Sequence, residues 1–216
     1  MDHRRIVELA AGLDGDTDEA ATLAARIDFL LEIDRLKTVI RRSLIVDGSR
    51  RENTAEHSWH LAMFAIVLAP YAPDGTDLAR AVEMLLVHDI VEVDAGDTYI
   101  YDEVGAADKA EREEQAAQRL YGLLPGGEGD RLADLWREYE ALSTPTARFA
   151  HAVDRLQPVL LNAASGGRSW LDNGIRHSQS AGVNVPVGQC SPLLGRLVEA
   201  VLGDGADAGL LIDDRG

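Results

Sequence analysis

Cysteine, aromatic residues and long apolar runs are all scarce in this chain of 216 residues. The single cysteine, Cys190, has no partner for an internal disulfide, so we expect a protein of the reducing cytoplasm. No uninterrupted run of about 18 apolar residues occurs, and no membrane-spanning helix is therefore expected. Aromatic residues make up only 5% of the chain while alanine and leucine are abundant, a composition that favours helices over sheets.

Basic residues are also few, because 21 Lys and Arg face 37 Asp and Glu and the formal net charge is −16. This acidity argues against binding to polymeric nucleic acid or to an anionic membrane. The balance reverses between residues 35 and 51, which hold one acidic residue and six basic ones: Arg35, Lys37, Arg41, Arg42, Arg50 and Arg51. This basic segment is a candidate phosphate-binding region, although on charge alone a solvated helix face followed by a turn is the stronger interpretation.

Most of the chain carries apolar residues at helical spacing, without the sustained alternation that is typical of strands. The pattern predicts an all-α protein, a single compact array of about eight helices. Residues 1–29 are expected to form an N-terminal helical extension and residues 30–165 the core. Residues 166–216 are expected to add C-terminal helices and a loose tail to the same domain.

Local signals predict several of the helix boundaries. Asp14-Gly15-Asp16 predicts a turn, and the helical pattern that follows it continues to Ile40, with or without a break. Thr54 is a suitable N-cap for the next helix, and Thr144-Pro145 is a suitable start for a later one. Two last helices are expected near residues 170–181 and 192–202, with a loose Gly- and Asp-rich tail from residue 203.

Polar side chains interrupt three of the predicted apolar helices. His57 begins one helix, the pair His88-Asp89 ends a second, and Asp154 lies in the middle of a third. Each alone is more often a hydrogen-bonded core histidine, a capping aspartate or one half of an ion pair. Together, two imidazoles and two carboxylates form a mixed nitrogen and oxygen ligand set that suits a divalent ion such as Mn²⁺, Co²⁺, Fe²⁺, Ni²⁺ or Zn²⁺.

Glu92 adds a carboxylate beside this ligand set. It follows Asp89 by three residues and His88 by four, so it projects onto the same side of a helix. Metal-assisted hydrolysis needs a general base at such a position. Ser58 has no evident base dedicated to it, so no covalent intermediate on the enzyme is expected.

The order of these residues resembles the HD superfamily of metal-dependent phosphohydrolases, which is named for the His-Asp pair. Within it, the sequence is most similar to the group of 5′-deoxynucleotidases and HD-domain-containing protein 2. The resemblance covers roughly residues 30–162. It rests on Arg42, residues 51–58, residues 88–92, Gly96-Asp97 and Asp154.

The resemblance implies one divalent ion held by four residues, His57, His88, Asp89 and Asp154. It implies that Glu92 orients or deprotonates the attacking water, that Arg42 holds the substrate phosphate, and that Asp97 contacts the sugar or assists proton transfer. The implied reaction is the release of phosphate from nucleoside 5′-monophosphates, including deoxyribonucleotides. Ser43 follows Arg42 where the family carries a bulky Trp that helps to reject the ribose 2′-hydroxyl, so the sugar preference stays open.

Other interpretations of the same residues also stay open. A nucleotide pyrophosphohydrolase or phosphodiesterase would use the same site, and a regulatory HD protein would bind nucleotide or metal without turnover. His60 and His151, each three residues from a predicted ligand, are expected to support the ligands rather than to bind a second metal. Trp59 is assigned to packing. The expected partners are a small phosphorylated substrate and, by analogy with relatives, a second copy of the chain.

Overall fold

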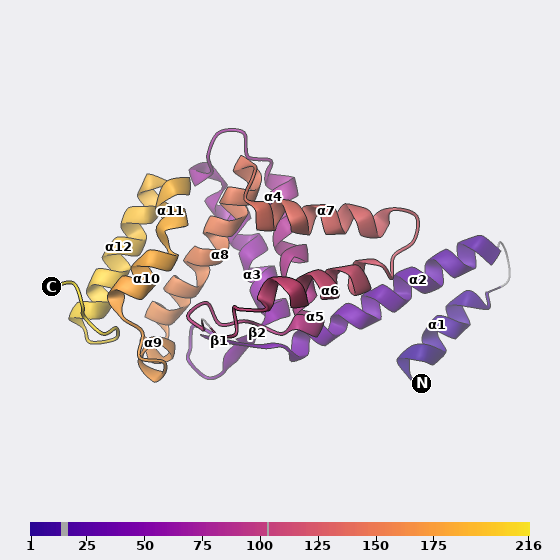
Figure 1. Cartoon of the computed structure of the whole chain (residues 1–216), viewed down its shortest axis with the longest axis horizontal. Helices are drawn as coiled ribbons and strands as arrows, with labels where there is room; N and C mark the ends of the chain where they lie inside the picture. Colours follow the sequence, from indigo (N-terminus) through magenta and orange to yellow (C-terminus); the bar gives the residue numbers. More distant parts are fainter. Residues whose placement is uncertain (14–16, 103) are drawn as a thin grey trace.

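The computed structural model describes residues 1–13, 17–102 and 104–216, so the predicted turn at residues 14–16 lies outside the described residues. These residues form twelve α-helices, three 3-10 helices and one two-stranded sheet (Figure 1). The predicted all-α class is confirmed, with more helices than the eight expected. The α-helices are α1 (His3–Ala11), α2 (Thr17–Ile33), α3 (Thr54–Leu68), α4 (Leu78–Val87), α5 (Glu92–Ala95), α6 (Lys109–Tyr121), α7 (Glu128–Ala141), α8 (Pro145–Ala164), α9 (Arg168–Asp172), α10 (His177–Val183), α11 (Val185–Cys190) and α12 (Pro192–Asp207).

A β-hairpin follows α2, where the helical pattern predicted a continuation to Ile40. α2 ends at Ile33, the 3-10 helix η1 (Asp34–Thr38) follows, and β1 (Ile40–Leu44) then pairs antiparallel with β2 (Arg51–Asn53). The turn between the strands contains Gly48 with φ of 68°, a conformation that glycine adopts without steric cost. The predicted helix is wrong here, and the hairpin lies between the α1–α2 end of the molecule and the C-terminal helices (Figure 1).

A capping box begins α3 immediately after β2. Asn53, rather than the predicted Thr54, is the N-cap, because its side chain accepts from the Glu56 amide at 3.0 Å while Glu56 accepts from the Asn53 amide at 3.1 Å. Two amide donors of the first turn are thereby satisfied. Thr54 becomes the first helical residue, fully buried, and its hydroxyl is directed into the protein.

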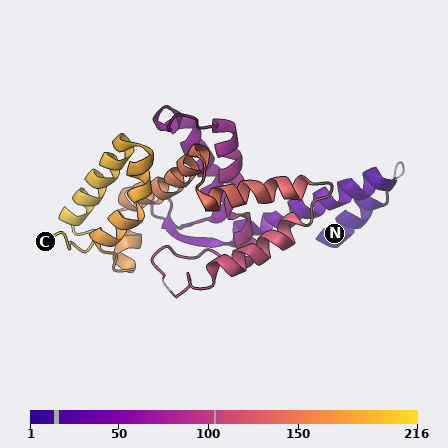
Figure 2. The same ribbon diagram turned by 45° about the horizontal axis from the view of Figure 1, so that its top comes forward.

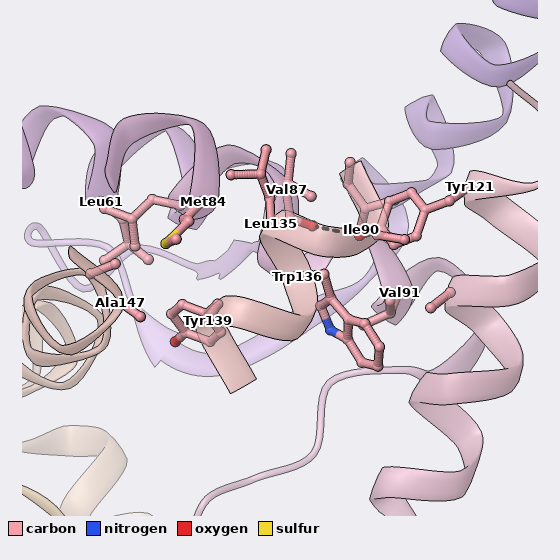
Figure 3. Close-up of a cluster of buried hydrophobic side chains, with 14 of the residues drawn as sticks. Leu61, Met84, Val87, Ile90, Val91, Tyr121, Leu135, Trp136, Tyr139 and Ala147 are labelled. Carbon is pink, nitrogen blue, oxygen red and sulfur yellow. Dashed lines mark hydrogen bonds between the residues drawn. The ribbon is translucent and has the colours of Figure 1, made fainter. Parts of the chain in front are cut away.

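α8 connects two apolar clusters. Its first half packs in a core with α3, α4, α6 and α7, which Figure 3 shows around Leu61, Met84 and Leu135. Its second half packs with α9–α12 around Trp170 and Leu202. Figures 1 and 2 place these C-terminal helices at one end of the molecule and the α1–α2 hairpin at the other. The predicted start of α8 is confirmed, since Thr144 caps it and Pro145 is its first residue.

The C-terminal region differs from the prediction in two places. The helix expected near residues 170–181 is divided into α9 and α10 by a turn in which Gly174 has φ of 60°. The tail expected from Gly203 instead continues α12 to Asp207, and Leu211 beyond it is 4% exposed. Apolar side chains hold this segment against α8 and α9. Throughout the described residues, each helix is too short or too polar to cross a bilayer.

Candidate active site

Three separate elements bring the predicted metal ligands together. His57 lies in the first turn of α3, His88-Asp89 opens the 3-10 helix η3 (His88–Val91) at the end of α4, and Asp154 lies at the middle of α8. One ligand atom each from His57, His88 and Asp154 lies within 4.8 Å of the others. Asp89 completes the group, with Oδ1 3.1 Å from His88 Nε2 and Oδ2 3.8 Å from His57 Nε2.

The tautomer of His88 is fixed by the backbone behind it. Its Nδ1 lies 3.1 Å from the Leu85 carbonyl oxygen, so Nδ1 carries the proton and donates it. Nε2 is then unprotonated, and its lone pair points at the Asp89 carboxylate. This nitrogen has no hydrogen-bond partner among the described residues. A buried lone pair that faces a carboxylate is stabilised by a cation between them, so the donor set fits a divalent ion.

His57 is supported from behind by a second carboxylate. Its Nε2 faces Asp154 Oδ1 at 3.0 Å, whereas Nδ1 lies 3.3 Å from Glu52 Oε1. Burial lowers the pKa of His57, as does Arg41, but the neighbouring carboxylates of Asp154 and Glu52 outweigh both and raise the pKa to about 9. A carboxylate behind a ligating histidine fixes the ring and increases its basicity. Glu52 was not singled out from the sequence, although it lies five residues before His57 and is 2% exposed.

Gln157 extends this support to His60. Its Nε2 donates to Glu52 Oε2 at 3.2 Å and lies 3.2 Å from His60 Nδ1. On the other side of the site, His151 Nε2 accepts from Arg155 Nε at 3.2 Å. Both histidines therefore contact side chains next to the ligand set. Trp59, which was assigned to packing, is instead 64% exposed, and that assignment is wrong.

Asp154 is held ionised by its neighbours. Burial alone would raise its pKa, but the hydrogen bond from His57 and the nearby positive charges hold the pKa of this carboxyl well below its usual range. The Tyr139 hydroxyl donates to Oδ2 at 3.0 Å, which leaves Oδ1 directed at the two imidazoles.

Arg41 is the guanidinium at the centre of the acidic cluster. Its Nη1 lies 3.3 Å from Asp89 Oδ2, 3.4 Å from Asp97 Oδ1 and 3.7 Å from Glu92 Oε1. Burial lowers the pKa of Arg41, yet these carboxylates outweigh burial and raise it. Arg42, the residue predicted to hold phosphate, lies on the wall of the same pocket with its guanidinium 5.6 Å from the centre of the Tyr99 ring.

The two arginines line the same pocket but contact different groups, since Arg41 faces the carboxylates and Arg42 faces the Tyr99 ring. The sequence signal for Arg41 was the basic segment itself, which did not distinguish between its members. Ser43, the next residue of β1, is 8% exposed and also lines the pocket.

Glu92 and Asp97 lie beside the ligand set, where both face the Arg41 guanidinium. Glu92 Oε2 accepts from the Thr54 hydroxyl at 2.8 Å, the bond that the position of Thr54 in α3 permits. Burial and the charge of Asp89 raise the pKa of Glu92 well above its usual range, despite Arg41. Burial likewise raises the pKa of Asp97, which follows Gly96 at a turn with φ of 75°. A carboxyl whose pKa is raised, next to a metal ligand set, is suited to proton transfer.

The comparisons with known proteins agree with this geometry. The model of the HD domain family matches residues 33–192, a stretch that contains all eight residues predicted for the site. The chain belongs to the HD domain family. Its HD domain is 31% identical over 135 residues to the human 5′-deoxynucleotidase HDDC2, in an alignment that covers 62% of this chain and 65% of the human protein. The chain thus matches somewhat less than two thirds of that relative.

Two solved structures resemble the chain over most of its length. A crystal structure of a predicted metal-dependent phosphohydrolase from Magnetospirillum magnetotacticum MS-1 has a TM-score of 0.86 and 46% identity, covering 91% of this chain and 98% of that one. A conserved hypothetical protein from Pyrococcus furiosus has a TM-score of 0.60 at 20% identity, covering 81% and 98% of the two chains. The second likeness concerns the fold alone.

Proposed function

We propose that this HD-domain protein is a metal-dependent phosphomonoesterase that acts on nucleoside 5′-monophosphates. The observation that carries the proposal is the convergence of a buried His/His/Asp/Asp ligand set, a guanidinium and a proton-accepting carboxyl in one pocket. The names of the relatives support it, since one is a 5′-deoxynucleotidase and another a metal-dependent phosphohydrolase. Phosphoryl transfer to water requires this combination of charge neutralisation and base catalysis.

The metal would be held by His57, His88, Asp89 and Asp154. Four protein ligands leave coordination positions for water and substrate, as expected for Mn²⁺, Co²⁺, Fe²⁺, Ni²⁺ or Zn²⁺. When bound, such an ion acts as a Lewis acid that neutralises phosphate charge and makes water more acidic.

The remaining residues have distinct roles in the proposal. Glu92, aligned by the Thr54 hydroxyl at 2.8 Å, takes the proton of the attacking water. Arg41 binds the phosphate oxygens and offsets the charge that develops during transfer, because it is the guanidinium nearest to the ligand set. Asp97, 3.4 Å from Arg41, orients that guanidinium or passes a proton to the leaving oxygen. Arg42, on the wall of the pocket, has a lesser role in the proposal and contacts the sugar or the outer phosphate oxygens.

Ser43 sets our expectation for the sugar. It is small, lies in β1 and lines the pocket, so nothing bulky at this position rejects a 2′-hydroxyl. We therefore propose that ribonucleotides and deoxyribonucleotides are both accepted.

The test is product analysis with metal-stripped protein and added Mn²⁺, Co²⁺ or Mg²⁺. We expect orthophosphate from nucleoside 5′-monophosphates of both sugars and little turnover of diphosphates, triphosphates or diesters. Pyrophosphate or a monoester as the product would favour a pyrophosphohydrolase or phosphodiesterase instead. Tight nucleotide binding without product under any of the ions would favour a regulatory HD protein.

We also propose that two copies of this chain pair through the outer face of α3. This face presents Trp59, Met63, Ile66 and Val67, which are 40–66% exposed. Residues 57–73 contain no Asp, Glu, Lys or Arg, although charged residues make up 27% of the chain. A helix that is apolar on every side is expected to be covered on every side. A second copy of the chain can pack against the outer face of α3, because an uncharged face is complementary to itself across a two-fold axis.

A further inference from the structure

The pocket continues beyond the metal ligands along α8. Asp154, Pro158 and Asn162 follow one another at intervals of four residues on this helix, and all three line the pocket. Eight residues of helix correspond to about 12 Å, so Asn162 lies well beyond the position of a phosphate bound at Asp154. A substrate that extends from its phosphate along α8 therefore reaches this distal part of the pocket.

The C-terminal helices build the opposite wall of this distal part. Trp170 from α9, Val183 from α10 and Asn184, which follows α10, all line it. Tyr99 lines the pocket as well, and the Arg42 guanidinium lies 5.6 Å from the centre of its ring. An aromatic and aliphatic enclosure of this kind suits a flat, weakly polar group such as a nucleobase. Residues 166–216 held no motif in the sequence, and this wall gives them a role.

Two residues that line this distal part, Asn162 on α8 and Asn184 after α10, have carboxamide oxygens without partners in the part of the chain that the structure describes. Asn162 is 8% exposed and Asn184 is 5% exposed, and the Oδ1 of each is buried without a hydrogen-bond partner in the described ranges 1–13, 17–102 and 104–216. The orientation of Asn184 is determined, because its Nδ2 donates to the Ser180 carbonyl at 2.8 Å. Buried acceptors that stay unpaired are costly, and two in one pocket call for donors from a ligand.

We infer that Asn162 and Asn184 form a base-recognition subsite that selects nucleobases with an exocyclic amino group. This inference rests on the proposed nucleotide phosphatase and names its preferred substrates: adenine and cytosine nucleotides over those of hypoxanthine and uracil. An amino group donates to the two oxygens. A carbonyl at the same ring position places its oxygen against the two carboxamide oxygens and donates no hydrogen bond to them. A site discriminates more strongly against a substrate that leaves its buried polar groups unpaired than against one that differs only in size.

The matched substrate pairs are AMP with IMP and CMP with UMP, because in each pair the exocyclic amino group is replaced by a carbonyl and the ring nitrogen beside it gains a proton. We expect kcat/KM for the amino member to exceed that for its partner at least tenfold. Asn162→Leu, which keeps the volume, and Asn184→Ala should each lower kcat/KM for AMP toward the IMP value. Either variant suffices to test the idea if the other does not fold.

Asn173→Ala is the control variant. Asn173 belongs to the same C-terminal region and also donates its Nδ2 to a helix carbonyl, that of Ser169 at 2.7 Å, but it does not line the pocket. The ratio of AMP to IMP turnover should be unchanged in it. A ratio near one in the wild-type protein, or a ratio that survives both Asn162→Leu and Asn184→Ala, would overturn the inference.

Binding separates this inference from the proposed reaction. Isothermal titration of metal-stripped protein with AMP and with IMP should show tighter binding of AMP, and Asn184→Ala should remove the difference. That result without phosphate release from any monophosphate would support the subsite and refute the phosphatase. Phosphate release with equal affinity for AMP and IMP, and equal turnover, would support the phosphatase and refute the subsite.

Discussion

At the scale of single residues, a motif does not decide whether Arg41 or Arg42 contacts the phosphate. Both lie in the basic segment, and resemblance placed the phosphate contact on Arg42. The local backbone decides which side chain is directed inward, and a five-residue strand puts Arg41 within 3.3 Å of Asp89 and Arg42 beside Tyr99. The predicted metal ligands come together in the fold, since each lies on a helical segment whose apolar residues pack in the core.

Replacing each arginine in turn tests the assignment of the phosphate contact. Arg41→Gln should lower kcat by about 100-fold or more, because it removes a preorganised charge beside the reacting phosphate. Arg42→Gln should lower kcat/KM less than tenfold, mainly through KM. Steady-state kinetics with AMP gives both values. The reverse order of effects would return the phosphate contact to Arg42.

His151 carries a prediction about stability and pH. Burial and the charge of Arg155 lower its pKa to about 4 in the folded protein, whereas an unfolded histidine titrates near 6.5. Between these values the unfolded chain binds the proton more readily, so stability is lost as the pH falls from 6.5 toward 4.

The His151→Gln variant should remove this part of the pH dependence. We expect the unfolding free energy of metal-stripped wild-type protein to fall about 2 kcal/mol further between pH 7 and pH 5 than that of the variant. Urea unfolding at the two pH values measures the difference. Equal slopes for the two proteins would show that His151 does not titrate in this window.

At the scale of elements, strong local signals were sufficient to predict where a helix begins, whereas short strands could not be predicted. Thr144-Pro145 predicted the start of α8 because capping and a fixed φ act within one turn. The hairpin escaped detection since β1 has five residues and β2 three, too few to show an alternating pattern. This hairpin also carries Glu52, which lies behind His57.

The capping box of α3 is expected to stabilise the site from a distance. Asn53→Ala should lower the free energy of unfolding by about 1 kcal/mol, because the Glu56 amide loses its acceptor. Asn53→Asp keeps an acceptor at the helix N-terminus and should lose less. Urea denaturation of the three proteins measures this. An unchanged midpoint for Asn53→Ala would mean that β2, and not the cap, fixes the start of α3.

At the scale of the whole molecule, packing determines which distant residues lie together, and no local sequence pattern contains this information. The four predicted metal ligands could be grouped from their order along the chain, and the fold brings them together. Asn162 and Asn184 could not, because they come to line one pocket only where α8 packs against the C-terminal helices. The same holds for the outer face of α3, whose apolar pattern predicts burial while the fold leaves Trp59 64% exposed.

Pairing through α3 predicts a dimer that a single charge disrupts. Met63→Glu should convert the protein from dimer to monomer in light scattering coupled to size exclusion, because two buried carboxylates would face each other across the axis. Leu30→Glu on α2, at a residue that is 57% exposed, is the matched control and should stay dimeric. A wild-type monomer at micromolar concentration would contradict the proposed interface.

The proposed function depends on a catalytic ion that the His/His/Asp/Asp cluster would hold. Its most direct test is phosphate release from AMP by metal-stripped wild-type protein and by Asp89→Ala, before and after Mn²⁺ is added. Asp89 lies 3.1 Å from His88 Nε2, so its loss should remove both tight Mn²⁺ binding and turnover. We predict activity only in the wild-type protein with added Mn²⁺. Full metal-dependent turnover by Asp89→Ala would contradict the assignment of the site.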